Sequence, residues 1–123
     1  MERKMDGPDI VWTNAGKEIV RLHGAEEGNG LTLFVTGSLN ERSEIDFKQE
    51  LMALASMGMD IVVDLTGAKR MTSGSMVAIL DAVQMAESTD HGLCLRGPSP
   101  EVYKQLERAH ITHSVEILEG GSK

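Results

Sequence analysis

The sequence predicts an α/β fold, a single domain with one mixed β-sheet of four to five strands covered by helices. Short apolar runs that are rich in β-branched residues alternate along the chain with segments of helical periodicity. The length of 123 residues suits one domain, and no linker or internal repeat interrupts the pattern. Hydrophobic residues make up 41% of the chain, as in ordinary globular proteins. The expected element order is β-β-α-β-α-β-α, with or without a final strand.

A β-hairpin is expected first. The segment from Lys17 to His23 has the apolar content of a strand, and residues 31–36 alternate with the period of a second strand. Between them, Asn29-Gly30 is a dipeptide typical of tight hairpin turns.

Three helices and at least two buried strands should follow the hairpin. Phe47, Leu51 and Leu54 recur at helical spacing, and Gly58 is a suitable stop after them. The other expected elements are a strand at 61–63, a helix from about Ser75 to Glu87, a strand at 93–95, a helix that starts at Ser99-Pro100 and a last extended segment at 115–118.

The predicted domain spans residues 17–118. Residues 1–16 are polar and contain Gly7-Pro8, so we expect a mobile tail or a short extra strand there. Residues 119–123 are expected to be disordered.

Composition excludes several classes of function. The formal net charge of -7 argues against nucleic-acid binding, which needs clustered cations. No apolar run approaches the roughly 20 residues of a membrane span and no signal peptide opens the chain, so we expect a cytoplasmic protein. The single cysteine, Cys94, rules out an internal disulfide and should be a buried, inert thiol. His110 and His113 lack further ligands at suitable spacing, so no metal and no cofactor is expected.

The stretch from Asp64 to Met76 is the strongest candidate site, because a strand leads through a small polar turn into a helix. Ser73 lies at that junction. A helix N-cap is the simplest interpretation of this serine. A catalytic nucleophile would need an adjacent base and a pattern such as G-x-S-x-G, and neither is present. A phosphoacceptor is the third interpretation, since a phosphate would add about -1.5 to -2 charges at a helix start where a partner docks.

Asp64 is a second candidate. It ends a strand at the position where α/β proteins bind ligands, which would suit a small molecule or a nucleotide. A role as a turn or capping acid is the favoured alternative.

From Ile19 to Leu118 the chain resembles a STAS domain, the module shared by bacterial anti-sigma-factor antagonists and the tails of sulphate transporters. The resemblance rests on four motifs in order: Val35-Thr36-Gly37-Ser38-Leu39-Asn40, Ile61-Val62-Val63-Asp64-Leu65-Thr66-Gly67, Met71-Thr72-Ser73-Gly74, and Leu93-Cys94-Leu95-Arg96-Gly97-Pro98-Ser99-Pro100.

The resemblance implies a non-enzymatic regulator. In the family, the unphosphorylated antagonist binds an anti-sigma factor that is also its serine kinase. Phosphorylation blocks this binding, and a phosphatase restores it. Ser73 falls on the phosphorylated serine, with Thr72 as an alternate acceptor. The partner-binding residues that the resemblance implies are Asn40, Thr72, Gly74, Ser75 and Met76.

The switch motif departs from the family pattern. Thr72 replaces an acid beside the serine, Gly74 and Ser75 replace a Ser/Ala-Gly pair, and Asn40 replaces the acid of a G-x-L-D turn. Two other functions therefore stay open: a STAS scaffold in a stress-signalling assembly, and a small-ligand or nucleotide-binding STAS module. We expect a monomer or a weak dimer.

Overall fold

A computed structural model describes residues 1–119 of the chain. Within them lies one sheet of eight strands, accompanied by α-helices and one short 3-10 helix. In chain order the elements are β1 (Glu2–Asp6), β2 (Asp9–Asn14), β3 (Lys17–Glu27), β4 (Gly30–Ser38), α1 (Ser43–Ala55), β5 (Ile61–Asp64), β6 (Ala68–Arg70), α2 (Ser73–Ser88), β7 (Leu93–Arg96), α3 (Pro100–Arg108), η1 (Ile111–His113) and β8 (Glu116–Leu118).

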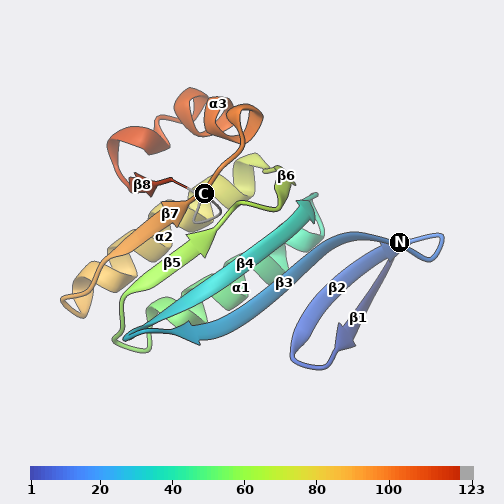
Figure 1. Ribbon diagram of the computed structural model, residues 1–123, viewed down its shortest axis with the longest axis horizontal. Helices are drawn as coiled ribbons and strands as arrows, with labels where there is room; N and C mark the ends of the chain where they lie inside the picture. Colours follow the sequence, from blue (N-terminus) through green and yellow to red (C-terminus); the bar gives the residue numbers. More distant parts are fainter. Residues whose placement is uncertain (120–123) are drawn as a thin grey trace.

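The sheet is antiparallel in its first half and parallel in its second. Its order is β1-β2-β3-β4-β5-β7-β8, and β6 pairs with the end of β4. The first three pairings are antiparallel, whereas β4 to β5, β5 to β7 and β7 to β8 are parallel (Figure 1). Parallel strands need crossover connections, which are usually helical, and α1 and α2 lie in two of these connections. The α/β fold class is confirmed.

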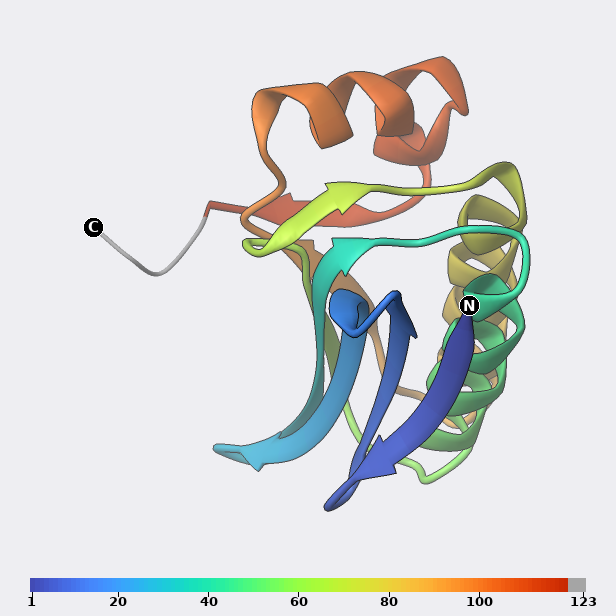
Figure 2. The same cartoon turned by 90° about the vertical axis from the view of Figure 1, so that its right-hand side faces the viewer.

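The helices α1 and α2 pack side by side along one face of the sheet, while α3 lies at one end of the molecule (Figure 2). The strands turn alternate residues toward α1 and α2, because side chains in a strand point to opposite faces. The core is therefore continuous across sheet and helices. Its fully buried side chains include Leu33, Val35, Phe47, Leu51, Ile61, Leu65, Ile79, Leu95 and Leu106.

The sheet has more strands than the four to five that we predicted. Residues 1–16 contain β1 and β2, which form an antiparallel hairpin in place of the expected tail or single short strand. All five residues of β1 are exposed, so no hydrophobic pattern marks this strand in the sequence. Its position depends on backbone pairing with β2 and on long-range side-chain contacts. Of the segment 119–123, expected to be disordered, only Glu119 lies within the described residues.

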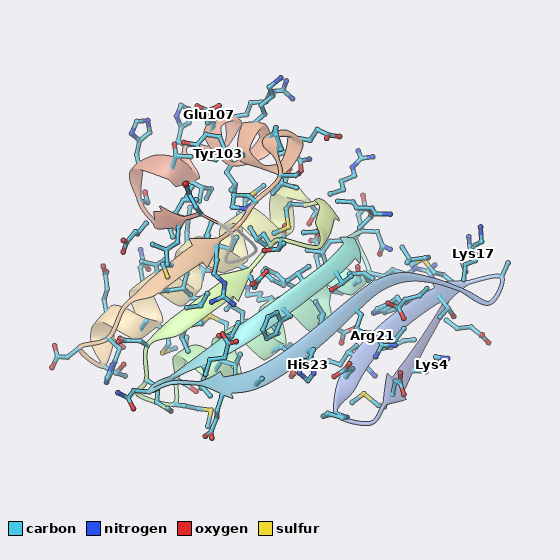
Figure 3. The ribbon with its side chains drawn as sticks, viewed as in Figure 1. Lys4, Lys17, Arg21, His23, Tyr103 and Glu107 are labelled. Carbon is cyan, nitrogen blue, oxygen red and sulfur yellow. The ribbon has the colours of Figure 1, made fainter. Side chains whose placement is uncertain are left out.

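Two anchors attach this hairpin to the domain, one on each face. On the helix side, the Asp46 carboxylate of α1 accepts hydrogen bonds from Trp12 Nε1 at 2.7 Å and from Arg3 Nε at 2.9 Å. On the other side, Arg21 of β3 forms ion pairs with Asp6 and Asp9. Figure 3 shows Arg21 on β3 beside the hairpin.

The other boundaries differ in small ways. The helix α2 begins at Ser73 and not near Ser75, because Thr72 supplies its cap. The strand β6 has only three residues, too few to give a sequence pattern. Cys94 is half-buried, not fully buried as expected, because its side chain points away from the helix-covered face.

Candidate functional site

A surface groove opens beside the start of α2. Its volume is about 1270 Å³, and it is lined by the β4–α1 turn, the β6–α2 turn, the first turns of α1 and α2, and the end of α3. Five of the predicted site residues line it: Asn40, Thr72, Ser73, Gly74 and Met76. Two of the sequence motifs, far apart in the chain, therefore meet at one place on the surface.

Ser73 is the first residue of α2, and its side chain is exposed. Within residues 1–119, no His, Asp or Lys side chain forms a hydrogen bond with it. A serine without a base is a poor nucleophile, whereas an exposed hydroxyl on a surface turn is accessible to another protein. Among the described residues, the Ser73 hydroxyl is thus exposed and has no hydrogen-bonded base that would activate it.

Thr72, and not Ser73, is the residue that caps α2. The Thr72 hydroxyl oxygen accepts from the N–H of Ser75 at 3.1 Å, and the Ser75 hydroxyl oxygen accepts from the N–H of Thr72 at 2.9 Å. This reciprocal pair is a capping box. In this arrangement Ser75 is fully buried, so it has a structural role at the start of the helix. We expected Ser75 at the partner-binding surface, but its side chain does not reach the surface.

Asn40 organises the other side of the groove. Its side-chain oxygen accepts from the N–H groups of Arg42 at 2.9 Å and Ser43 at 3.0 Å, and this holds the first turn of α1 in place. Its amide nitrogen lies 3.5 Å from the sulfur of Met1. The N-terminal hairpin therefore reaches the edge of the groove.

Gln105 of α3 fixes the turn that leads into α2 and carries Thr72 and Ser73. The N–H of Met71 donates to Gln105 Oε1 at 3.1 Å, and Gln105 Nε2 donates to the Met71 carbonyl at 3.3 Å. The two residues are 34 positions apart, and no sequence signal pairs them.

The charges around the groove are separated by sign. Glu41 and Glu44 line it from the α1 side, while Arg70 and Arg108 line it from the β6 and α3 sides. Glu44 also lies against Gly74, so that a Cβ built on this glycine would overlap the Glu44 carboxylate. Sequence analysis missed all four charged residues, since only the folded chain brings them together.

The family model described as "Mlab, STAS domain" matches residues 22–119 of this chain. The chain belongs to the STAS domain family. This confirms the resemblance that the four motifs indicated. The hairpin of β1 and β2 lies outside the matched range.

Solved structures with the same fold include anti-sigma factor antagonists. An antagonist from Mycobacterium paratuberculosis has a TM-score of 0.73 at 10% identity, covering 80% of this chain and 85% of that protein. The unphosphorylated form of SpoIIAA has a TM-score of 0.71 at 13% identity, with coverage of 82% and 89%. The phosphorylated form of SpoIIAA from Bacillus has a TM-score of 0.66 at 12% identity, with coverage of 82% and 92%. At such identities the likeness concerns the fold. No curated protein matches the chain at the sequence level.

In this STAS domain Asp64 lies outside the groove. Its carboxylate accepts from the N–H of Thr66 at 2.9 Å and from Arg96 Nε at 2.8 Å. Burial alone would raise the pKa of Asp64, but the hydrogen bonds from Thr66 and Arg96 outweigh burial and hold that pKa below its ordinary value. Arg96 also reaches Glu27 at 3.2 Å. Both oxygens of Asp64 thus have partners inside the domain, which favours the role of a turn acid over that of a ligand-binding residue.

The remaining candidates give no second site. Within residues 1–119, no group of three His, Cys, Asp or Glu side chains is arranged to hold a metal. His110 and His113 stack on each other with ring centroids 6.3 Å apart. Burial raises the pKa of the Cys94 thiol, which favours its protonated form. Among the helices of the described region, none is long and apolar enough to cross a membrane.

Proposed function

We propose that this STAS domain is a cytoplasmic regulatory protein of the anti-sigma-factor antagonist type, which acts by partner switching and not by catalysis. In its unphosphorylated form it binds an anti-sigma factor that is also a serine kinase. Phosphorylation of Ser73 by this kinase ends the binding, and a phosphatase restores it.

The observation that carries the proposal is the position of Ser73. Its exposed hydroxyl stands at the first residue of α2, on the edge of a groove that two separate motifs form. The helix start tolerates an anion, because the free N–H groups and the helix dipole favour negative charge there. A phosphate at Ser73 is therefore compatible with the folded domain.

A partner that covers the groove would not tolerate the phosphate. Removing a doubly charged group from water costs several kcal/mol unless the partner supplies matching cations. One modification can thus separate two proteins while leaving each of them folded.

Thr72 is a weaker acceptor than Ser73. Its hydroxyl oxygen caps α2, and its side chain is only half-exposed. A phosphate on Thr72 would modify the hydroxyl that forms this cap, whereas a phosphate on Ser73 leaves the capping box unchanged. We therefore assign the modification to Ser73 and keep Thr72 as the alternate acceptor.

The test begins with partner capture from lysate of the native host, using the immobilised chain and its Ser73→Asp and Gln84→Glu variants. Gln84 is exposed further along α2, so Gln84→Glu adds one negative charge to the same helix far from the groove. We expect the unchanged chain and Gln84→Glu to retain a protein that Ser73→Asp does not retain. With ATP, that protein should phosphorylate the chain.

Peptide mapping then locates the phosphate. Trypsin cleaves after Arg70 and Arg96, so Thr72 and Ser73 lie on one peptide and fragmentation must distinguish them. A phosphate on Ser73 that is missing in Ser73→Ala supports the switch. Equal capture by all variants, with no phosphate on this peptide, would refute it and favour a scaffold or ligand-binding role.

A further inference from the structure

The side chain of Glu44 lies against the start of α2, although Glu44 is not part of that helix. It belongs to the first turn of α1, it is half-buried, and its carboxylate lies against Gly74, where a side chain would overlap it. Gly74 has no positive φ, so its backbone does not require glycine. The absence of a side chain at Gly74 instead provides the space that the carboxylate fills.

The start of α2 attracts a negative charge. Thr72 Oγ1 accepts from the N–H of Ser75, but the N–H groups of Ser73 and Gly74 donate to no atom within residues 1–119. Unpaired N–H groups and the helix dipole make this end electropositive. A carboxylate beside Gly74 is therefore held there by electrostatic attraction as well as by packing.

We propose that Glu44 is a positioning residue that senses the charge at Ser73: its carboxylate rests on the start of α2 when Ser73 is unmodified, and a phosphate on Ser73 expels it. This inference rests on the proposed function only in taking Ser73 as the modified residue. The two anions compete for the same helix end, and the phosphate carries about -1.5 to -2 charges against one for the carboxylate. Like charges at such neighbouring positions repel each other.

Expulsion of Glu44 would alter a second surface. A smaller groove of about 600 Å³ runs between α1 and α2, and Glu44, Gly74 and Val77 line both grooves. This smaller groove is mainly apolar, with Ile45 59% and Val77 55% exposed. Glu44 lines both grooves, whereas Ser73 lines only the larger one. Movement of Glu44 therefore makes the shape and charge of the smaller groove depend on whether Ser73 is phosphorylated.

A double-mutant cycle on the purified full chain tests the coupling without any partner. The variants are Ser73→Asp, Glu44→Gln and the pair together, and the readout is the melting temperature. An aspartate at the first position of α2 benefits from the helix dipole, but Glu44 repels it in the unchanged chain. We expect Ser73→Asp to raise the melting temperature by about 2 to 4 °C more in the Glu44→Gln background than in the unchanged chain. This difference should shrink in 1 M sodium chloride.

Two further variants make the test specific. Glu41→Gln removes a neighbouring acid that lines the same groove, whereas the atoms nearest to a Cβ at Gly74 all belong to Glu44, so the cycle of Glu41→Gln with Ser73→Asp should show little coupling. Gly74→Ala displaces the Glu44 carboxylate without changing any charge. In the Gly74→Ala background, Ser73→Asp should therefore raise the melting temperature by as much as it does in the Glu44→Gln background.

Additive effects of Ser73→Asp and Glu44→Gln, or equal coupling with Glu41→Gln, would overturn the inference. The cycle needs no kinase, so its failure would leave the phosphorylation switch standing. Conversely, failure to find a kinase would leave the measured coupling intact.

Discussion

Gln105 holds the backbone of Met71 through both groups of its side-chain amide, accepting from its N–H at 3.1 Å and donating to its carbonyl at 3.3 Å. Met71 is 2% exposed and immediately precedes Thr72, the cap of α2. The turn that presents Ser73 is thus attached to α3 as well as to its own helix. This contact makes the end of α3 part of the site.

Replacing Gln105 by alanine should weaken this attachment. The change leaves the polar groups of a nearly buried backbone without partners, so we expect the free energy of unfolding to fall by about 1 to 3 kcal/mol in urea denaturation. Gln105→Glu keeps the acceptor oxygen but loses the N–H donor. Its free energy of unfolding should lie between those of the unchanged chain and Gln105→Ala. Lys104→Ala, at an exposed position on the same helix, is the control. Equal stability of Gln105→Ala and Lys104→Ala would show that the contact carries no energy.

The ion pair between Asp64 and Arg96 should make stability depend on pH in the acid range. The pKa of Asp64 lies below its ordinary value of 3.8, since the bonds from Thr66 and Arg96 outweigh the effect of burial. At acid pH the unfolded chain therefore binds more protons at this residue than the folded chain does. Its contribution to stability is complete above the unfolded pKa and is lost as the pH falls through the lowered folded pKa.

Comparison of the chain with Asp64→Asn checks this sign. At pH 7 we expect Asp64→Asn to be about 1 to 3 kcal/mol less stable, with the difference shrinking below about pH 4. Asp81→Asn is the control, because within residues 1–119 the pair of Asp81 with Lys48 is long, at 3.9 Å, and exposed. A difference that stays constant from pH 7 to pH 3 would contradict the assignment.

Asp46 should control the attachment of the N-terminal hairpin. Its carboxylate is 6% exposed and accepts from Trp12 and Arg3, so Asp46→Ala leaves both donors without their partner. Hydrogen bonds to a charged group contribute about 1.5 to 3 kcal/mol to stability, and we expect the free energy of unfolding of Asp46→Ala to fall by this amount.

Trp12 is the single tryptophan of the chain, so its fluorescence reports the environment of the hairpin. Its emission should shift to the red in Asp46→Ala and less in Asp46→Asn, which keeps one acceptor oxygen. An unchanged spectrum would show that Asp46 does not hold the hairpin.

The elements predictable from sequence were those that carry a local pattern. The hairpin around Asn29-Gly30, the β-branched strand β5 and the helix start at Ser99-Pro100 each follow from residues that are close together in the chain. The strand β1 was missed because its five exposed residues have no apolar period, and Arg3 meets Asp46 only after folding.

The same distinction applies to the site. Ser73 could be located from its junction between strand and helix. Thr72 as the cap could have been found from the spacing of Thr72 and Ser75, which is that of a capping box, although a serine stands where Glu or Gln is usual. The contacts of Gln105 with Met71 and of Glu44 with Gly74 join distant segments, and no local pattern specifies them.

Gly37 should be the least replaceable glycine near the site. Its φ is +96°, and a Cβ there would overlap the carbonyl oxygen of Ile19 in the neighbouring strand β3. Its N–H also donates to the carbonyl of Gly67 at 2.9 Å, so Gly37 joins β3, β4 and the approach to β6 at one point.

An alanine at Gly37 must therefore either adopt a strained backbone or separate β4 from β3. We expect Gly37→Ala to lower the free energy of unfolding by about 3 kcal/mol or more. The variant should also give a lower soluble yield and be cleaved faster by proteases. Gly92→Ala is the matched control, because no atom of the described residues lies within 4 Å of a Cβ at that position and its φ is not positive. It should leave stability unchanged or raise it by about 0.4 to 1 kcal/mol. If Gly37→Ala were as stable as Gly92→Ala, the close approach of β3 and β4 beside the groove would not be a constraint on this fold.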